Sequence, residues 1–180
     1  MNIQPLILSL KKQSNFIQYL LLSVVGKYST FIFDIIVIHK LTRENFGKYS
    51  LALLVANFAF TFGINWHSSV MVFIGAKEKA DHGRLNRTFH ARNIITLSFL
   101  VLITLTFLIY KDQITNYIGI DLTYIILIYI YSRVISDYFR QYFFAVKKQK
   151  TAQIMVLVSR LFQISVVLFF KIDLTRLIML

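Results

Sequence analysis

Three charged residues lie on one face of an otherwise apolar segment, YSRVISDYFRQYFF at residues 131–144. Arg133, Asp137 and Arg140 are spaced four and three residues apart, so a helix would place all three on the same face. A guanidinium group suits a phosphate because its planar fork binds two oxygens at once and stays protonated even when partly desolvated. The candidate chemistry is therefore the binding of an anion, and the elements around this segment must position it.

The composition of the chain places this segment in a membrane. Of the 180 residues, 57% are hydrophobic and only 16% are charged, and a single proline and six glycines leave few breaks. A helix needs about 20 apolar residues to cross a bilayer core that is about 30 Å thick. Nothing in the sequence alternates with period two as the strands of a membrane barrel do, so we predict an all-α polytopic integral membrane protein. Its five predicted spans are residues 16–38, 49–74, 93–110, 122–145 and 152–170.

The end of the sequence resembles the start of another helix. A polar connector follows the fifth predicted span, and the apolar residues LIML at 177–180 come after it. We therefore expect residues 1–180 to form a single helical lobe, with the start of a sixth transmembrane helix, in the N-terminal part of a longer protein.

The distribution of lysine and arginine predicts the orientation in the membrane. Segments on the N-terminal side of the predicted spans carry eleven of these residues, and segments on the opposite side carry six. The positive-inside rule therefore places the N-terminus in the cytoplasm.

Four of the five predicted spans carry polar residues on a single helical face, whereas the span at 93–110 has no charge and is expected to face lipid. Lys27, Arg133 and Arg160 lie near the middle of their spans, where each charge costs about 3 kcal/mol of insertion free energy. Water, a partner or a bound anion would have to offset that cost, so we expect the four helices to enclose a wet cavity. The residues expected to face this lumen are the charged Lys27, Asp34, Arg133, Asp137, Arg140 and Arg160 and the polar Thr30, Asn57, Asn65 and Gln163.

Ion pairing gives a purely structural alternative. Arg133 and Asp137 could neutralise each other at i and i+4, or Asp137 could pair with Arg160 from the next helix. Lys27 would still lack a partner, because Asp34 lies two turns away, about 10 Å along the helix axis.

Other chemistries leave no signature in the sequence. There is no cysteine, and the four histidines show no metal-ligand spacing, so we expect no thiolate site and no metal. No glycine-rich phosphate loop and no catalytic constellation is present, so we expect neither a cofactor nor an enzymatic activity. The basic loop at 77–92 has no aromatic platform for nucleic acid, which excludes that class of partner.

The stretch LTRENFGKYSLALLVANFAFTFGINW at residues 41–66 resembles a known family of membrane proteins. Leu41, Phe46, Gly47 and Tyr49 match the Leu-x-x-x-x-Phe-Gly-x-Tyr pattern before the second helix of polysaccharide-biosynthesis proteins, in particular the O-antigen flippases. These belong to the multidrug/oligosaccharidyl-lipid/polysaccharide export superfamily. The resemblance covers about residues 15–175, including the aromatic fourth helix and the arginine in the fifth.

The resemblance implies a fold of two lobes around a central lumen, of which this chain supplies about one. It implies the flipping of an anionic lipid-pyrophosphate-linked oligosaccharide across the bacterial inner membrane, with a polysaccharide polymerase and chain-length proteins as further partners. In that setting we expect Arg133 to contact the pyrophosphate, Asp137 to orient the side chain of Arg133, and Arg140 to meet the substrate earlier. Two alternatives stay open: a cation-coupled multidrug exporter, which would use the carboxylates, and a non-transporting membrane subunit or scaffold, whose charges only join helices.

Overall fold

The computed structural model describes residues 4–169 and 178, and every regular element in that part of the chain is helical. The predicted all-α class is therefore confirmed. The elements are α1 (Gln4–Lys40), α2 (Arg43–Gly63), the short 3₁₀ helix η1 (Asn65–His67), α3 (Ser68–His82), α4 (Asn86–Ile109), α5 (Lys111–Ile118), α6 (Thr123–Ala145) and α7 (Gln149–Phe169).

Three helical segments in the described chain are long and apolar enough to cross a membrane: Phe16–Lys40, Asn86–Ile109 and Gln149–Leu168. Two bent pairs of helices pass the same test together, α2 with η1 and α3, and α5 with α6, which brings the number to five if each pair is one span. The chain is thus a helical membrane protein with three to five candidate spans.

The second predicted span, at 49–74, is not one continuous helix. The chain bends by 43° between α2 and the segment of η1 and α3. Gly63 ends α2, where its backbone freedom weakens the helix. A Cβ atom at this position would lie 2.7 Å from Cδ1 of Ile103, so the glycine lets α2 lie close to α4 without displacing that side chain.

Helix α5 was also not expected, since the sequence predicts a loop after residue 110. It turns by 96° into α6. Lys111 at its start forms an ion pair of 2.8 Å with Asp121, which follows its end, and also lies over the ring of Tyr124. The hydrogen bond from the lysine ammonium lowers the pKa of Asp121 below its ordinary value, so the pair fastens this corner at neutral pH.

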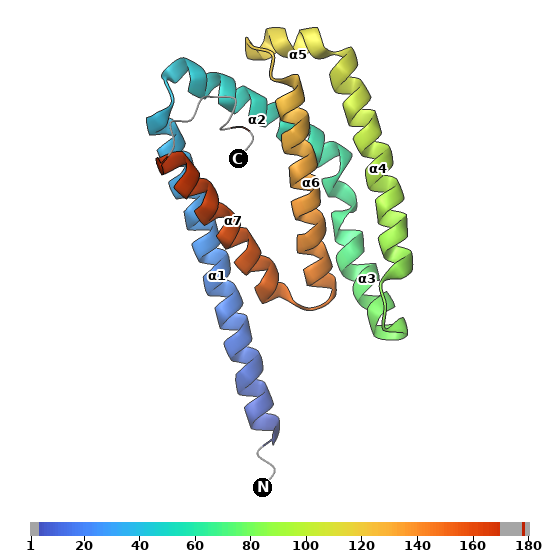
Figure 1. Cartoon of the computed structure of the whole chain (residues 1–180). Coiled ribbons are helices and arrows are strands. Elements are labelled where there is room, and N and C mark those ends of the chain that lie inside the picture. Colours follow the sequence, from blue (N-terminus) through green and yellow to red (C-terminus); the bar gives the residue numbers. More distant parts are fainter. Residues whose placement is uncertain (1–3, 170–177, 179–180) are drawn as a thin grey trace.

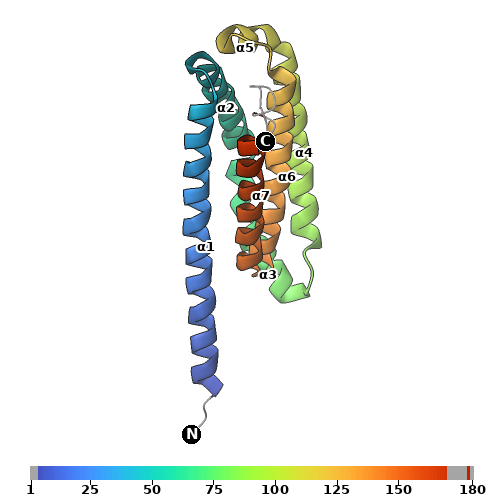
Figure 2. The same ribbon diagram turned by 60° about the vertical axis from the view of Figure 1, so that its left-hand side comes forward.

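The helices form two groups: α1 with α7, and the α2–α6 group, which consists of all elements from α2 to α6 (Figures 1 and 2). Helix α7 packs along α1, while α6 lies centrally and contacts α2, α3, α4 and α7. The turn between α6 and α7 joins the two groups at one end, and the short connection from α1 to α2 joins them at the other (Figure 1).

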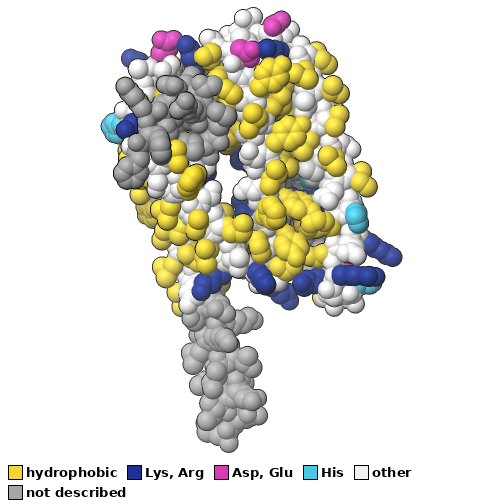
Figure 3. Space-filling view, viewed as in Figure 1, with side chains coloured by type: hydrophobic (Ala, Val, Ile, Leu, Met, Phe, Trp, Pro, Cys, Tyr) yellow, Lys and Arg dark blue, Asp and Glu magenta, His cyan; other side chains and the backbone are white. Residues whose placement is uncertain are grey.

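The surface of the molecule is that of a protein surrounded by lipid. Large apolar side chains are highly exposed, among them Phe73 at 76% and Ile109 at 72%. A soluble protein rarely exposes contiguous apolar surface on this scale. Lysine and arginine gather at the end that holds the α3–α4 and α6–α7 turns (Figure 3). This is the end that the positive-inside rule predicts to be cytoplasmic.

Fusion of a reporter that is active only outside the cytoplasm tests that orientation. Lys111 and Arg87 lie at opposite ends of α4, so a fusion after Lys111 should give signal and a fusion after Arg87 should give none. The reverse pattern would contradict the predicted orientation.

Glu78 closes the turn between α3 and α4 at the basic end. Its carboxylate accepts hydrogen bonds from the backbone N–H groups of Arg87 and Thr88, at 2.8 and 2.9 Å, and from the hydroxyl of Thr88 at 2.6 Å. These N–H groups belong to the first turn of α4 and have no acceptor within their own helix. Glu78 therefore caps the N-terminus of α4 from the preceding helix.

Glu78→Ala should therefore loosen this turn. Trypsin should cut at Arg84 and Arg87 several-fold faster in the variant than in the natural chain, as measured by fragment appearance on gels of the purified protein. Glu44→Ala is the matched control, because Glu44 makes only an exposed ion pair with Lys48 and its loss should leave the rate unchanged. Equal rates for both variants would show that Glu78 does not hold the turn.

Candidate functional site

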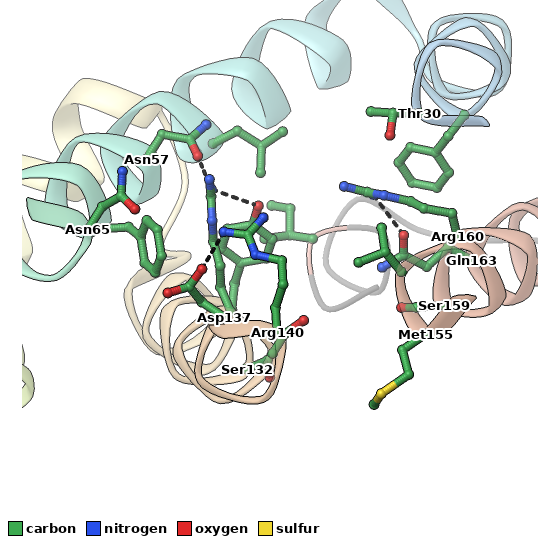
Figure 4. A pocket seen from close by; sticks show the side chains of 18 of the residues that line it. Thr30, Asn57, Asn65, Ser132, Asp137, Arg140, Met155, Ser159, Arg160 and Gln163 are labelled. Carbon is green, nitrogen blue, oxygen red and sulfur yellow. Dashed lines mark hydrogen bonds and ion pairs between the residues drawn. The ribbon is translucent and has the colours of Figure 1, made fainter. Parts of the chain in front are cut away.

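A cavity of about 800 Å³ lies between α1, α2, α6 and α7. Helix α1 contributes Thr30 and Asp34 to its wall, and α2, η1, α6 and α7 contribute the arginines and amides (Figure 4). Nine of the ten residues predicted to face a lumen line this cavity. They are Thr30, Asp34, Asn57, Asn65, Arg133, Asp137, Arg140, Arg160 and Gln163.

Lys27 is the residue whose placement differs from the prediction. It is exposed and is not part of the cavity wall. The buried face of α1 runs through Gly26, Ser29, Phe33 and Val37, and Lys27 lies beside that face. Lys27 was predicted to face the lumen because it lies on the same helical face as Asp34. The spacing of polar residues does not show which part of that face the neighbouring helices cover.

Arg133 is held at the cavity wall by α2. Its guanidinium group donates to the amide oxygen of Asn57 and, at 3.4 Å, to the hydroxyl of Tyr129, and it lies 4.4 Å from the ring centre of Phe60. These oxygens are neutral, so they fix the direction of the guanidinium group without cancelling its charge.

Asp137 binds two arginines. Its buried carboxylate, 5% exposed, forms an ion pair with Arg140 on the cavity side and another, at 3.4 Å, with Arg92. The amide nitrogen of Gln141 also donates to it, at 2.5 Å. Asp137 therefore connects Arg140 in the cavity wall with Arg92, which is buried between α4 and α6.

The partner of Asp137 in α4 is a residue that sequence reasoning missed. Arg92 was assigned to a basic loop, but it is 3% exposed and its guanidinium carbon lies 4.8 Å from the ring centre of Tyr138. Residues 93–110 carry no charge, as predicted, but α4 begins at residue 86 and therefore also includes Arg92, on a face that packs inside the protein. One signal could have shown it: Thr88, Arg92 and Thr96 recur at every fourth residue and form a polar stripe of their own.

Arg160 faces the cavity from α7, across from the arginines of α6 (Figure 4). It donates to the side-chain oxygen of Gln163 at 2.8 Å and lies 5.9 Å from the ring centre of Phe33. The cavity thus has guanidinium groups on two opposite walls.

The charges of the wall do not cancel. Three arginines, Arg133, Arg140 and Arg160, face two carboxylates, Asp34 and Asp137. Asp137 binds Arg140 in the wall and also Arg92, which lies outside the wall. When Arg92 is counted, four arginines stand against two carboxylates, so the net charge is +2, which favours an anionic ligand.

Comparison of the chain with models of protein families, with curated proteins and with solved structures found no match. The residues of the cavity and the pattern at residues 41–66 are therefore the features that bear on function.

The buried pair of Arg92 and Asp137 can be tested with a double-variant cycle. Asp137→Ala should leave Arg92 buried without its counter-charge and cost about 3–5 kcal/mol of stability, because removal of one partner of a buried ion pair exposes the full desolvation cost of the other. Membrane abundance and the melting temperature of the purified protein should both fall.

Adding Arg92→Met to Asp137→Ala should restore most of the abundance, since both buried charges are then gone. Adding Arg133→Ala to Asp137→Ala is the control and should not restore it, because Arg133 is held by Asn57 and Tyr129. Rescue by Arg133→Ala would show that the structural partner of Asp137 is Arg133.

Proposed function

We propose that this chain forms one helical lobe of a flippase that carries lipid-pyrophosphate-linked oligosaccharide units across the bacterial inner membrane for O-antigen or other surface polysaccharide. The observation that supports this most directly is the convergence of Arg133, Arg140 and Arg160 on one cavity of about 800 Å³ between membrane-length helices.

The chemistry of the wall suits a diphosphate. Guanidinium groups bind phosphate oxygens in pairs and keep their charge when partly desolvated. Arg133 and Arg160 lie near the middle of α6 and α7, where a charge that served no purpose would cost about 3 kcal/mol of insertion free energy. Their position on opposite walls would let an anion contact both groups at once.

A cation-coupled multidrug exporter fits the wall less well. Such a transporter would need accessible carboxylates for its cationic substrate, but Asp137 already pairs with Arg92 and Arg140. A scaffold whose charges only join helices also fits less well, since the described contacts of Arg133 and Arg160 include neutral oxygens from Asn57, Tyr129 and Gln163.

The proposed setting follows from this assignment. The chain would lie in the inner membrane with its N-terminus in the cytoplasm, take its substrate from the cytoplasmic leaflet, and work beside a polysaccharide polymerase and chain-length proteins. Arg140 lies closer to the basic end of α6 than Arg133, so it would meet the pyrophosphate first.

Variants of Arg133 test the proposal in the native host, with the altered gene on the chromosome. Arg133→Ala should abolish most surface polysaccharide, seen on gels of cell-surface extracts, while the abundance of the protein stays near normal. Arg133→Lys should recover part of the activity, because the charge remains but the fork that binds two oxygens is lost.

Lys27→Ala is the matched control, since it also removes a cation from a membrane-length helix but lies outside the cavity. It should leave surface polysaccharide unchanged. Normal polysaccharide in Arg133→Ala, or an equal loss in Lys27→Ala, would remove the cavity arginine from the substrate path.

A further inference from the structure

A second group of polar side chains lies behind Asp137, on the side away from the cavity. His67, Arg92, Thr96 and Gln141 are each at least 93% buried. None of the four lines the cavity. They come from η1, α4 and α6, so they belong to the interior of the α2–α6 group.

Two of these side chains bind one carboxylate. Arg92 and Gln141 both donate to the same oxygen of Asp137, at 3.4 and 2.5 Å. Thr96 lies one turn along α4 from Arg92, on the same face. The ring of His67 lies 6.4 Å from that of Phe99, in the next turn of α4.

Much of their hydrogen-bonding capacity has no partner among the described residues. The atoms concerned are Nδ1 and Nε2 of His67, Nε and Nη1 of Arg92, Oγ1 of Thr96 and Oε1 of Gln141. Buried polar groups are nearly always satisfied by protein or by ordered water. Thr96 is informative here, because Ser98, Thr104 and Thr106 in the same helix each donate to the carbonyl four residues earlier.

We propose that this polar cluster holds a file of ordered water molecules, which runs inside the α2–α6 group from Gln141 near the basic end to His67 at the break between α2 and α3. Water fits this set because it both donates and accepts. Arg92 and Thr96 supply donors, whereas the oxygen of Gln141 and one nitrogen of a neutral His67 need a donor. An anion would satisfy only the first group.

The water file gives Asp137 a second contact with solvent. One side of its carboxylate faces the cavity, where Arg140 binds it, and the other side would face the file. Asp137 would then stay hydrated while a ligand fills the cavity. This inference does not depend on what the cavity binds.

Hydroxyl radicals produced from bound water by a short X-ray pulse, followed by mass spectrometry, test the proposal on the purified full protein. His67 should be labelled at a rate within about tenfold of the exposed His82, although its side chain is buried. Met71 serves as an internal control: it lies one turn from His67, is 0% exposed, and carries a readily oxidised sulfur. It should stay unlabelled if water is confined to the polar cluster.

The double variant Thr96→Val with Gln141→Leu removes two partners of the water while nearly keeping side-chain volume, so labelling of His67 should fall several-fold. Ser98→Val is the matched control, since Ser98 is exposed two residues from Thr96 on the opposite face of α4. Three results would each overturn the proposal: an unlabelled His67 in the natural protein, equal labelling of His67 and Met71, which indicates general opening, and unchanged labelling in the double variant.

Discussion

The buried contact between Arg92 and Asp137 is the interaction on which the arrangement of the site depends. It joins α4 to α6 through charges that are 2% and 4% exposed, in a region where an uncompensated charge is expensive. The pair is one member of a network, because Arg140 and Gln141 bind the same carboxylate. Asp137 is thereby held in the wall of the cavity, and its negative charge is shared with an arginine that the cavity does not contain.

This sharing explains how the cavity arginines keep their attraction for an anion although a carboxylate lies beside them. If Asp137 had only cavity arginines for partners, it would neutralise one of them completely. Since Arg92 takes part of its charge, Arg133 and Arg160 can be oriented by neutral amide and phenol groups and keep their attraction for an anion. The cost of burying these cations is then offset by hydrogen bonds, by aromatic faces such as Phe60, and by water in the cavity.

The all-α class and most of the cavity wall could be predicted from the sequence, because helical periodicity is a local property. Asn57 and Arg133 lie on polar stripes of their own helices, and both line the cavity. The break at Gly63 was missed because the apolar residues 70–74, which follow the stretch NWHSS at 65–69, extend the apolar pattern to the length of one span. The stripe of Thr88, Arg92 and Thr96 could have placed Arg92 on a helix, but its partner could not be predicted, because Asp137 lies 45 positions away and no local pattern shows which residue supplies the counter-charge.

Helix α6 therefore carries polar side chains on two faces. Arg133 and Arg140 face the cavity shared with α1 and α7, while Gln141 faces the interior shared with α4, and Asp137 lies between them. Any movement of α6 relative to α4 would have to break the contact with Arg92, whereas movement of α1 and α7 relative to α6 would leave that contact intact. The contact with Arg92 thus holds the α6 wall of the cavity against α4, whereas α1 and α7 form the opposite wall and take no part in that contact.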